Sequence, residues 1–334
     1  MRKYIVLLSG LLLCATLDVC AQQPSQVQPM GTAMENYAYP YPVHYLPLHI
    51  QGQDLEMAYM DVKPDSWNGK TFLLLHGKNF FAAYWKDVIR ALTAQGYRVV
   101  APDQVGFGKS SKPDIHYSFE LLASNTRQVL DTLGIRQVFV VGHSMGGMLA
   151  TRFSLMYPER VQKLIYENPL GLEDYREKGV PYRSIADEYQ VQLHQTFERL
   201  VNYQKKNYFY RWKDAYNEWI EPVFRWTLSP EYPRIAMVSA LTYEMIYTQP
   251  VCHEFKDLKM PVLLMLGQND HTALGKDRVS PEVLKTLGNF PELGKKLSRE
   301  IPDCKYIPIP ECGHIPHLEH FDLFMKAVLD FAAH

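Results

Sequence analysis

A serine between closely spaced glycines is the first feature of this sequence that can do chemistry. The stretch from Gly142 to Gly147 reads GHSMGG; it follows the apolar run 137–141 and opens a segment with helical periodicity. A nucleophile elbow forms in this strand–turn–helix setting, because its tight turn requires small residues two positions before and after the serine. Such a turn presents the hydroxyl at the carboxyl edge of a sheet. Ser144 is therefore the predicted nucleophile.

A serine hydroxyl needs a base at neutral pH, and His314 is the best placed of the twelve histidines. It follows the last apolar run, 305–309, in a loop that contains Gly313. His317 and His320 come next at steps of three, a spacing that predicts one exposed helix face. No carboxylate or thiol at a usual spacing supports the alternative of a metal site there.

The base needs an acid that fixes its tautomer and stabilises the imidazolium. Asp270 comes directly after the apolar run 261–266, at the same edge of the expected sheet as Ser144. The chain order Ser144, Asp270, His314 is the order of this motif class. Glu167 ends the preceding apolar run and is the alternative acid.

Acyl transfer also needs hydrogen-bond donors for the oxyanion. One is expected to be the backbone N–H of Met145, directly after the nucleophile. The other is expected from the loop 76–79, where the N–H of Lys78 is the first choice and that of Asn79 the second. The Lys78 side chain could attract an anionic substrate, although a solvated lysine is the simpler interpretation.

Short apolar runs alternate with helical patterns along the chain, which predicts a parallel sheet with helices on both faces. The expected strands are 55–62, 71–75, 98–101, 137–141, 163–166, 261–266 and 305–309. The expected helices include 85–92, 118–133, 145–156 and 321–331. About 90 residues between 166 and 261 interrupt the alternation with helical patterns only, as where Leu193, Phe197, Leu200 and Val201 share one predicted helix face.

The interrupting segment is rich in aromatic residues. Sixteen aromatic residues lie between positions 170 and 250, about a fifth of that segment, against 13% of the whole chain. Large side chains could build the core of a small helical unit, and they could also line an apolar pocket as a lid. Both uses are expected for different members of the set.

Length and charge restrict the class of protein. The 334 residues exceed one ordinary domain, and 35 basic against 36 acidic residues give a net charge of −1. A nucleic-acid partner is not expected, because such proteins carry a strongly basic face. With 47% hydrophobic residues, the chain is not mainly disordered.

The N-terminus has the layout of a secretory signal. Arg2 and Lys3 precede an uncharged run, 4–17, and a small-residue cleavage pattern that ends at Ala21. We therefore expect residues 1–21 to be a signal peptide and the protein to be periplasmic or secreted. The apolar run is too short for a stable membrane span. Lipidation of Cys20 is the less favoured alternative, because aspartate and valine are poor residues before a lipidated cysteine. Residues 22–43 then form an extended leader.

Cleavage after residue 21 would leave three cysteines, Cys252, Cys304 and Cys312, an odd number that does not form a disulfide framework. Cys304 and Cys312 stand at opposite ends of one expected strand and are too far apart to bridge. Cys252 could pair with either, but free, buried thiols are favoured.

These motifs together resemble the α/β-hydrolase family, specifically its cap-bearing serine hydrolases. The matching pieces are 75–77, 102–110, 142–147, Asp270 and 313–314. The resemblance implies an eight-stranded, mostly parallel sheet with helices on both faces and a helical cap inserted after strand six. The core would comprise residues 44–168 and 255–334, and the aromatic-rich cap residues 169–254. In this family Asp103, Gly106 and Gly108 belong to a loop that sets conformation.

Departures from relatives narrow the expected reaction. Epoxide hydrolases and haloalkane dehalogenases carry aspartate where this chain has Ser144. Prolyl aminopeptidases and carbon–carbon bond hydrolases usually have a more glycine-rich oxyanion loop than His-Gly-Lys-Asn at 76–79. The broadest fit is an ester hydrolase that forms an acyl-enzyme, binds a small acyl substrate under the cap and needs no metal or organic cofactor.

Three alternatives stay open at this point. A carbon–carbon bond hydrolase could share the scaffold, and so could a non-catalytic binding protein. An aminopeptidase would need acidic cap groups to hold the substrate amine. The available carboxylates are Glu173, Asp174, Glu188 and Glu218.

Overall fold

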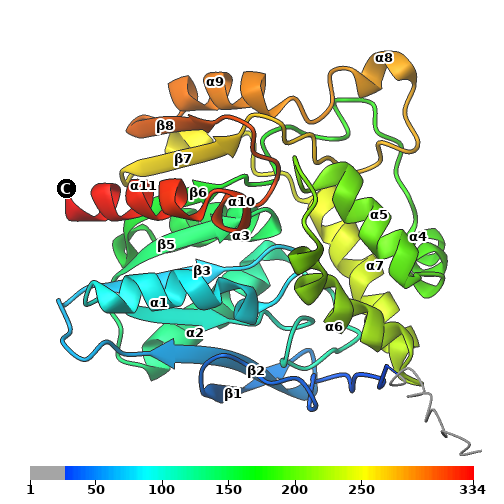
Figure 1. Ribbon diagram of the computed structural model, residues 1–334, viewed down its shortest axis with the longest axis horizontal. Coiled ribbons are helices and arrows are strands. Elements are labelled where there is room, and N and C mark those ends of the chain that lie inside the picture. The colour runs from blue at the N-terminus through cyan, green and yellow to red at the C-terminus, as the bar shows by residue number, and fades with distance from the viewer. Residues whose placement is uncertain (1–26) are drawn as a thin grey trace, which may run out of the picture.

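The computed structural model describes residues 27–334, so the predicted signal peptide, 1–21, lies outside the described residues. Eight strands form one sheet in the spatial order β1-β2-β4-β3-β5-β6-β7-β8 (Figure 1). The strands are β1 (Val43–Ile50), β2 (Gln53–Val62), β3 (Thr71–Leu75), β4 (Arg98–Pro102), β5 (Val138–His143), β6 (Val161–Glu167), β7 (Val262–Gly267) and β8 (Cys304–Ile309). β2 pairs antiparallel with β1 and β4, and all other pairs are parallel. The predicted eight-stranded, mostly parallel sheet is confirmed.

The central strands are buried on both faces, which explains their continuous apolar sequences. Every residue of β3, β5 and β7 is buried. The edge strand β1 was missed by the sequence analysis. Only Leu48 and Ile50 of that strand are buried, so no apolar run marks it.

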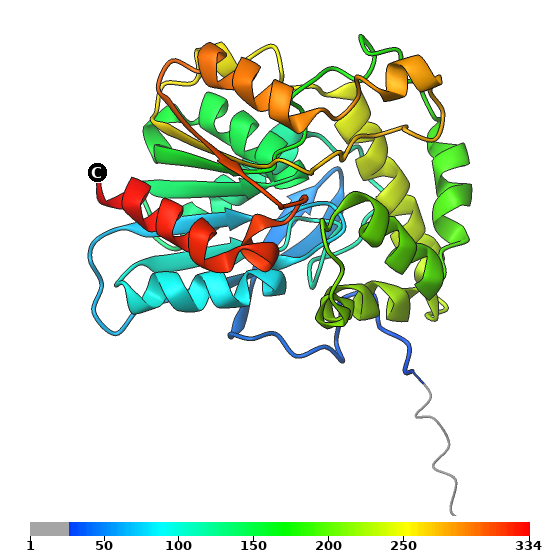
Figure 2. The same ribbon diagram turned by 45° about the horizontal axis from the view of Figure 1, so that its top comes forward.

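Helices cover both faces of the sheet, as Figures 1 and 2 show. On one face lie α1 (Lys86–Ala94) and α11 (Phe321–Ala333), whose apolar residues share one core cluster. On the other lie α2 (Phe119–Thr132), α3 (Met145–Met156) and α9 (Phe290–Glu300). The helix expected to start at Ser118 begins there, because the Ser118 hydroxyl accepts the Leu121 N–H at 3.0 Å. Two short helices, α8 (Pro281–Leu284) and α10 (Pro316–Glu319), complete the core.

Four α-helices lie between β6 and β7 in the sequence and form a cap over the carboxyl ends of the strands (Figure 1). They are α4 (Ile185–Leu193), α5 (Phe197–Asn207), α6 (Asn217–Thr227) and α7 (Tyr232–Thr248). The predicted helical insertion after strand six is therefore present. One detail was wrong: Leu193 does not share a helix with Phe197, because the Thr196 hydroxyl accepts the Arg199 N–H at 3.2 Å and starts a new helix.

The segment 27–42, part of the predicted leader, packs against both cap and core. Met30 and Met34 are fully buried. The Trp226 indole of α6 donates to the carbonyl of Gly31 at 2.9 Å, and the Tyr39 hydroxyl donates to Asp103 at 2.7 Å. This segment therefore ties the cap to the loop after β4.

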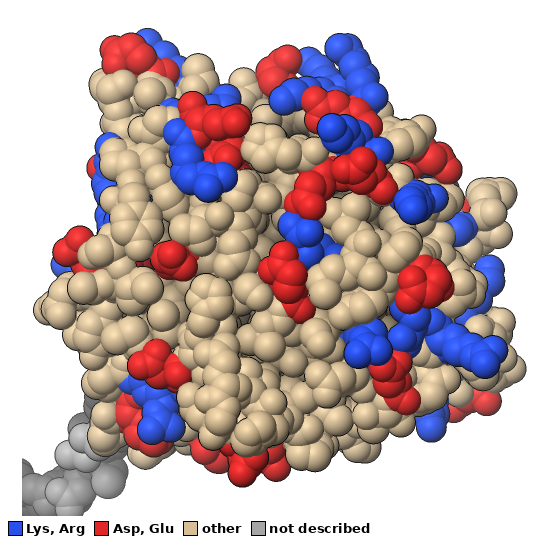
Figure 3. Space-filling view, turned by 180° about the vertical axis from the view of Figure 1, so that it is seen from behind, with Lys and Arg blue, Asp and Glu red and all other residues tan. Residues whose placement is uncertain are grey.

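The near-zero net charge and the odd number of cysteines predicted from the sequence can be compared with the surface and the thiols of the structure. Acidic and basic side chains are interspersed on the face in Figure 3. Among residues 27–334 no helix is long and apolar enough to cross a membrane. Cys252, Cys304 and Cys312 are free, and Cys312 is buried.

Candidate active site

Ser144 lies in a strained turn between β5 and α3. Its φ of 56° and ψ of −122° place a non-glycine residue in a conformation that costs energy and occurs mainly at functional sites. The glycines around it are required by close contact. A Cβ on Gly146 would lie 2.2 Å from the carbonyl oxygen of Leu75, and one on Gly142 would lie 2.5 Å from that of Gly146. The GHSMGG sequence thus permits the turn that places Ser144 at the sheet edge.

The structure brings His314 and Asp270 together. His314 Nδ1 lies 2.6 Å from Asp270 Oδ2, and both side chains are fully buried. Burial acts to raise the pKa of Asp270, but the charge and hydrogen bond of His314, together with hydrogen bonds from Thr272, bring it below the ordinary value. With Nδ1 hydrogen-bonded to this carboxylate, Nε2 is left as the basic nitrogen of the ring.

Asn168 is a third partner of this pair that sequence reasoning missed. Its side-chain amide donates to Asp270 Oδ2 at 2.6 Å and, at 3.3 Å, to the carbonyl of Gly313. Its own carbonyl oxygen accepts the Gly267 N–H at 3.0 Å. Asn168 follows β6 directly and has a φ of 39°, a left-handed value that asparagine tolerates better than most residues. The sequence did offer one indication of a role for Asn168, namely its position directly after a buried strand.

The nucleophile and the base come from adjoining loops. His143, next to Ser144, donates through Nε2–H to the carbonyl of His314 at 2.9 Å, and the centres of the two rings lie 4.9 Å apart. No hydrogen bond joins Ser144 to His314 within residues 27–334, and His314 Nε2 is buried without a partner there. Catalytic hydrogen bonds are often long before substrate binds. Ser144 itself is 4% exposed.

Glu167 does not lie at His314. Its carboxylate oxygens are 2.9 and 3.0 Å from Nδ1 of His317, and one of them accepts the His317 N–H at 2.7 Å. The expectation that His317 lies on an exposed helix face was therefore wrong: its ring is buried and stacks on Trp85 at 4.4 Å. The buried carboxylate of Glu167 needs hydrogen-bond donors, and the His317 side chain and backbone N–H supply them, which stabilises the buried position of this histidine.

The loop after β3 reaches the nucleophile. A Cβ on Gly77 would lie 3.1 Å from the Cβ of Ser144. Neither the Lys78 N–H nor the Met145 N–H donates a hydrogen bond within the described chain. The N–H groups of both predicted oxyanion donors therefore have no acceptor among the described residues.

Tyr84 joins this loop to the elbow, and nothing in the sequence singled it out. The Gly77 N–H donates to its hydroxyl at 3.2 Å, and the hydroxyl lies 3.0 Å from His143 Nδ1. Burial and the neighbouring histidines His314 and His317 hold the pKa of His143 well below its ordinary value, so the ring is neutral. Tyr84 therefore donates to His143 Nδ1, and His143 Nε2–H donates to the carbonyl of His314.

The Lys78 side chain turns toward the cap, not into solvent. Its Nζ donates to the Ser239 hydroxyl of α7 at 2.7 Å. Burial lowers the pKa of Lys78 to about 8, against an opposing effect of Glu188. The side chain is thus half-buried against the cap, where the sequence favoured a solvated lysine.

One cap aromatic residue contacts the base directly. The Tyr208 ring stacks on His314 at 4.9 Å with 28° between the planes, and its carbonyl accepts the His314 N–H at 2.6 Å. The amide of Asn79 donates to the Tyr208 hydroxyl at 2.7 Å. A Cβ on Gly313 would lie 2.3 Å from the carbonyl oxygen of Tyr208, so glycine is required where the cap crosses the base loop.

Two surface cavities lie away from these residues. One of about 360 Å³ is bordered by Lys112 and Arg234, and one of about 330 Å³ by Gln51 and Gln128. Neither is lined by Ser144, Asp270 or His314.

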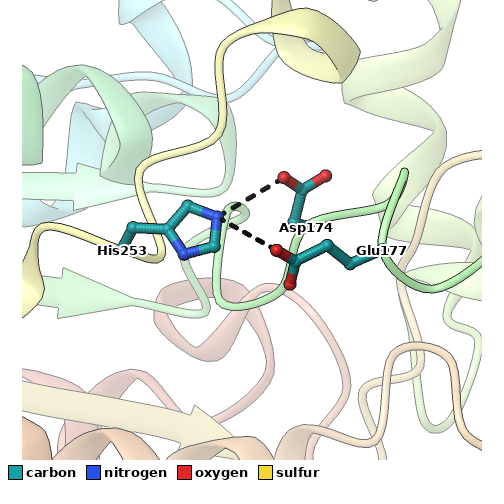
Figure 4. A group of neighbouring side chains, drawn as sticks. All are labelled: Asp174, Glu177 and His253. Carbon is teal, nitrogen blue, oxygen red and sulfur yellow. Dashed lines mark hydrogen bonds and ion pairs between the residues drawn. The ribbon is translucent and has the colours of Figure 1, made fainter.

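Asp174, Glu177 and His253 form a cluster whose atoms are spaced closely enough for a metal ion (Figure 4). His253 Nε2 lies 3.4 Å from Asp174 and 3.9 Å from Glu177. Asp174 is already bound by both Nε and Nη2 of Arg176, which lowers the pKa of Asp174 to about 2. An ion-pair network accounts for the cluster.

The family model for the alpha/beta hydrolase fold matches residues 70–321. A 2-hydroxy-6-oxo-6-phenylhexa-2,4-dienoate hydrolase from Burkholderia cepacia is 29% identical over 276 residues, 80% of this chain and 90% of that protein. The crystal structure of a probable hydrolytic enzyme from Pseudomonas aeruginosa PAO1 is 45% identical, with a TM-score of 0.90 over 92% of this chain and 99% of that chain.

An esterase from Exiguobacterium antarcticum shares the fold at 18% identity, with a TM-score of 0.66 over 86% of this chain and 99% of the esterase. The family match spans most of the chain and includes Ser144, Asp270 and His314. The chain belongs to the alpha/beta hydrolase fold family and is a hydrolase.

Proposed function

We propose that this protein hydrolyses carboxylic esters through Ser144, His314 and Asp270. The observation that carries the proposal is the buried pair of His314 and Asp270, whose side chains lie 2.6 Å apart. The loop of His314 is hydrogen-bonded to His143, beside the strained Ser144, and Nε2 of His314 is left without a partner among the described residues. A carboxylate on Nδ1 leaves Nε2 as the base that a serine nucleophile needs.

The proposed mechanism has two halves. In the first, the Ser144 proton passes to His314 Nε2 while Oγ bonds to the ester carbonyl carbon. The Met145 and Lys78 N–H groups hold the oxyanion. The carbon–oxygen bond to the alcohol then breaks, and His314 returns the proton to the leaving oxygen.

In the second half, His314 takes a proton from water as the water oxygen attacks the acyl carbon. The bond from that carbon to Ser144 breaks, and His314 returns the proton to the serine oxygen. Asp270 stays ionised throughout and stabilises the imidazolium.

We propose that the small acyl substrate binds under the cap. Ser144 and His314 are covered, so the cap must move to admit it. Tyr208 of the cap stacks on the proposed base, His314, and this contact supports a binding site lined in part by aromatic side chains of the cap.

The aminopeptidase alternative needs free acidic groups in the cap, and the candidates are engaged. Glu173 accepts the Gly288 N–H, Asp174 binds Arg176, Glu188 binds Arg183, and Glu218 binds Lys86. A carbon–carbon bond hydrolase stays the second candidate, because three of the similar curated proteins are named as hydrolases of 2-hydroxy-6-oxo dienoates or dienedioates. A non-catalytic binding protein would have no use for a complete serine, histidine and aspartate set.

A substrate panel separates these functions. Purified protein and its Ser144→Ala variant are assayed with p-nitrophenyl acyl esters, amino-acid nitroanilides and a 2-hydroxy-6-oxo dienoate. We expect ester hydrolysis by the native protein and a loss of several orders of magnitude in the variant. Near-full activity in Ser144→Ala overturns the mechanism, and a preference for the dienoate or the nitroanilides favours the corresponding alternative.

We also propose that the protein is exported after removal of residues 1–21. The basic pair, apolar run and cleavage pattern at the N-terminus support this. N-terminal sequencing of the protein from a fractionated native host tests it: a mature chain starting at Gln22 outside the cytoplasm is expected, and an intact N-terminus in the cytoplasm contradicts it.

A further inference from the structure

One face of cap helix α7 lies along the edge of the proposed site. Ser239, Tyr243 and Tyr247 are spaced by four residues and so share that face. Ser239 receives a hydrogen bond from Lys78, and Tyr243 receives one from Arg278 at 2.7 Å. Lys78 and Arg278, which come from separate core loops, therefore bind the same face of α7 at positions about one helical turn apart.

Lys78 belongs to the proposed reaction centre. Its backbone N–H is a proposed oxyanion donor, and its side chain runs from there to α7. Within the described residues its ammonium makes one hydrogen bond, to Ser239, and no ion pair. An ammonium has three N–H donors, so two remain for another acceptor.

Arg278 lies in the loop that follows Asp270. Its Nη2 donates to the Tyr243 hydroxyl, but Nε and Nη1 are buried and have no hydrogen-bond partner within residues 27–334. The carboxylate oxygen of Asp277 is 3.8 Å from Nε, too far for a hydrogen bond. Buried guanidinium donors without acceptors are costly, so these point to an acceptor supplied from outside the chain.

The nearby carboxylates are engaged elsewhere. Both oxygens of Glu188 are occupied, one by Arg183 at 2.8 Å and the other by Gln192 at 2.7 Å. Asp277 also binds Arg183, at 2.5 Å. There are therefore three cationic side chains here, those of Lys78, Arg278 and Arg183, and two carboxylates, those of Glu188 and Asp277. Neither carboxylate makes a hydrogen bond to Lys78 or Arg278.

We propose that Lys78 and Arg278 recognise a carboxylate of the substrate, so that the enzyme prefers esters that carry a second, ionised carboxyl group. This inference rests on the proposed ester hydrolysis. Because Lys78 supplies both an oxyanion donor and the charge, its side-chain length limits the separation between the reacting carbonyl and the carboxylate to a few bonds. Mono-esters of short dicarboxylic acids fit this limit.

The test compares p-nitrophenyl hydrogen glutarate with its neutral counterpart, p-nitrophenyl methyl glutarate. A hydrogen-bonded charge should favour the anionic ester by about 10- to 100-fold in kcat/KM. In Lys78→Met the preference should fall to about one. The ratio of the two kcat/KM values is the readout, because the Lys78 N–H is also a proposed oxyanion donor and the substitution alters the rates of both esters. Lys78→Arg should restore part of the preference, and Arg278→Met should lower it.

Lys63→Met is the matched control, since Lys63 is exposed and its ammonium makes no ion pair with another described residue. Its preference should equal that of the native protein. If neutral esters are cleaved through Ser144 with no preference, or if Lys78→Met keeps the preference, this inference is overturned and the proposed function stands.

If neither ester is cleaved, the proposed function fails, and calorimetric binding of p-nitrophenyl hydrogen glutarate to Ser144→Ala decides the inference. Binding that Lys78→Met abolishes supports carboxylate recognition. Absence of binding overturns it.

Discussion

The Glu167 carboxylate lies 2.9 Å from Nδ1 of His317, behind the site and not at its base. Two buried carboxylate–histidine pairs therefore stand at this sheet edge. Nε2 of both histidines lacks a hydrogen-bond partner among the described residues. The two pairs differ in their neighbours: the carbonyl of His314 is bound by His143 of the Ser144 elbow, whereas His317 is enclosed by Trp85 and Tyr84. The geometry gives the two acids different roles.

Replacing each acid by its amide separates these roles. Asp270→Asn should lower kcat by about 10³- to 10⁴-fold, because an amide favours the wrong tautomer of His314 and cannot stabilise the imidazolium. Glu167→Gln should keep kcat within about tenfold and lower the free energy of unfolding by about 1–3 kcal/mol. Kinetics and urea unfolding of both variants check this. A larger loss of kcat in Glu167→Gln would contradict the assignment.

Tyr84→Phe removes the hydroxyl that joins Gly77 to His143. We expect kcat to fall about tenfold with KM nearly unchanged, because the proposed oxyanion loop is then no longer held in position relative to Ser144. Tyr97→Phe is the control, since Tyr97 packs on Phe72 and Phe139 and its hydroxyl makes no hydrogen bond with another described residue. Equal kcat in the two variants would show that Tyr84 only fills space.

The preference for the anionic ester should depend on pH through Lys78. Burial lowers the pKa of Lys78 to about 8, and Glu188, held by Arg183, is the charged group that opposes this shift. The lysine is charged below that pH and neutral above it, so the kcat/KM ratio should be constant near pH 7 and fall by up to tenfold per unit above 8. In Lys78→Arg the ratio should persist to pH 9. A ratio that is flat from pH 7 to 9 in the native protein would contradict it.

Gly313→Ala places a Cβ 2.3 Å from the carbonyl oxygen of Tyr208 and 2.9 Å from the N of Tyr210. The cap segment must shift away from His314, which should lower kcat at least tenfold and the free energy of unfolding by about 1–3 kcal/mol. Kinetics and thermal unfolding measure both effects. Native values for both would mean that the cap does not rest on this loop.

The sequence predicted what depends on local pattern. The buried strands β3, β5 and β7 appear as apolar runs, and the elbow appears as glycine spacing, so both can be recognised from neighbouring residues. Edge strand β1 buries only two residues and leaves no such run. Tyr84, Asn168 and Tyr208 were missed because their partners lie 7 to 129 positions away in the chain, and a contact at that separation has no local signal. His317 was misplaced for the same reason, since Glu167 is 150 residues distant.

The most direct test of the central claim is the site at which a fluorophosphonate reacts. The native protein is treated with the probe, digested and analysed by mass spectrometry, with Ser144→Ala and His314→Ala treated in parallel. We predict one adduct on Ser144, none in Ser144→Ala and greatly slowed labelling in His314→Ala. Absence of an adduct on Ser144, or equal labelling of the His314 variant, would contradict it.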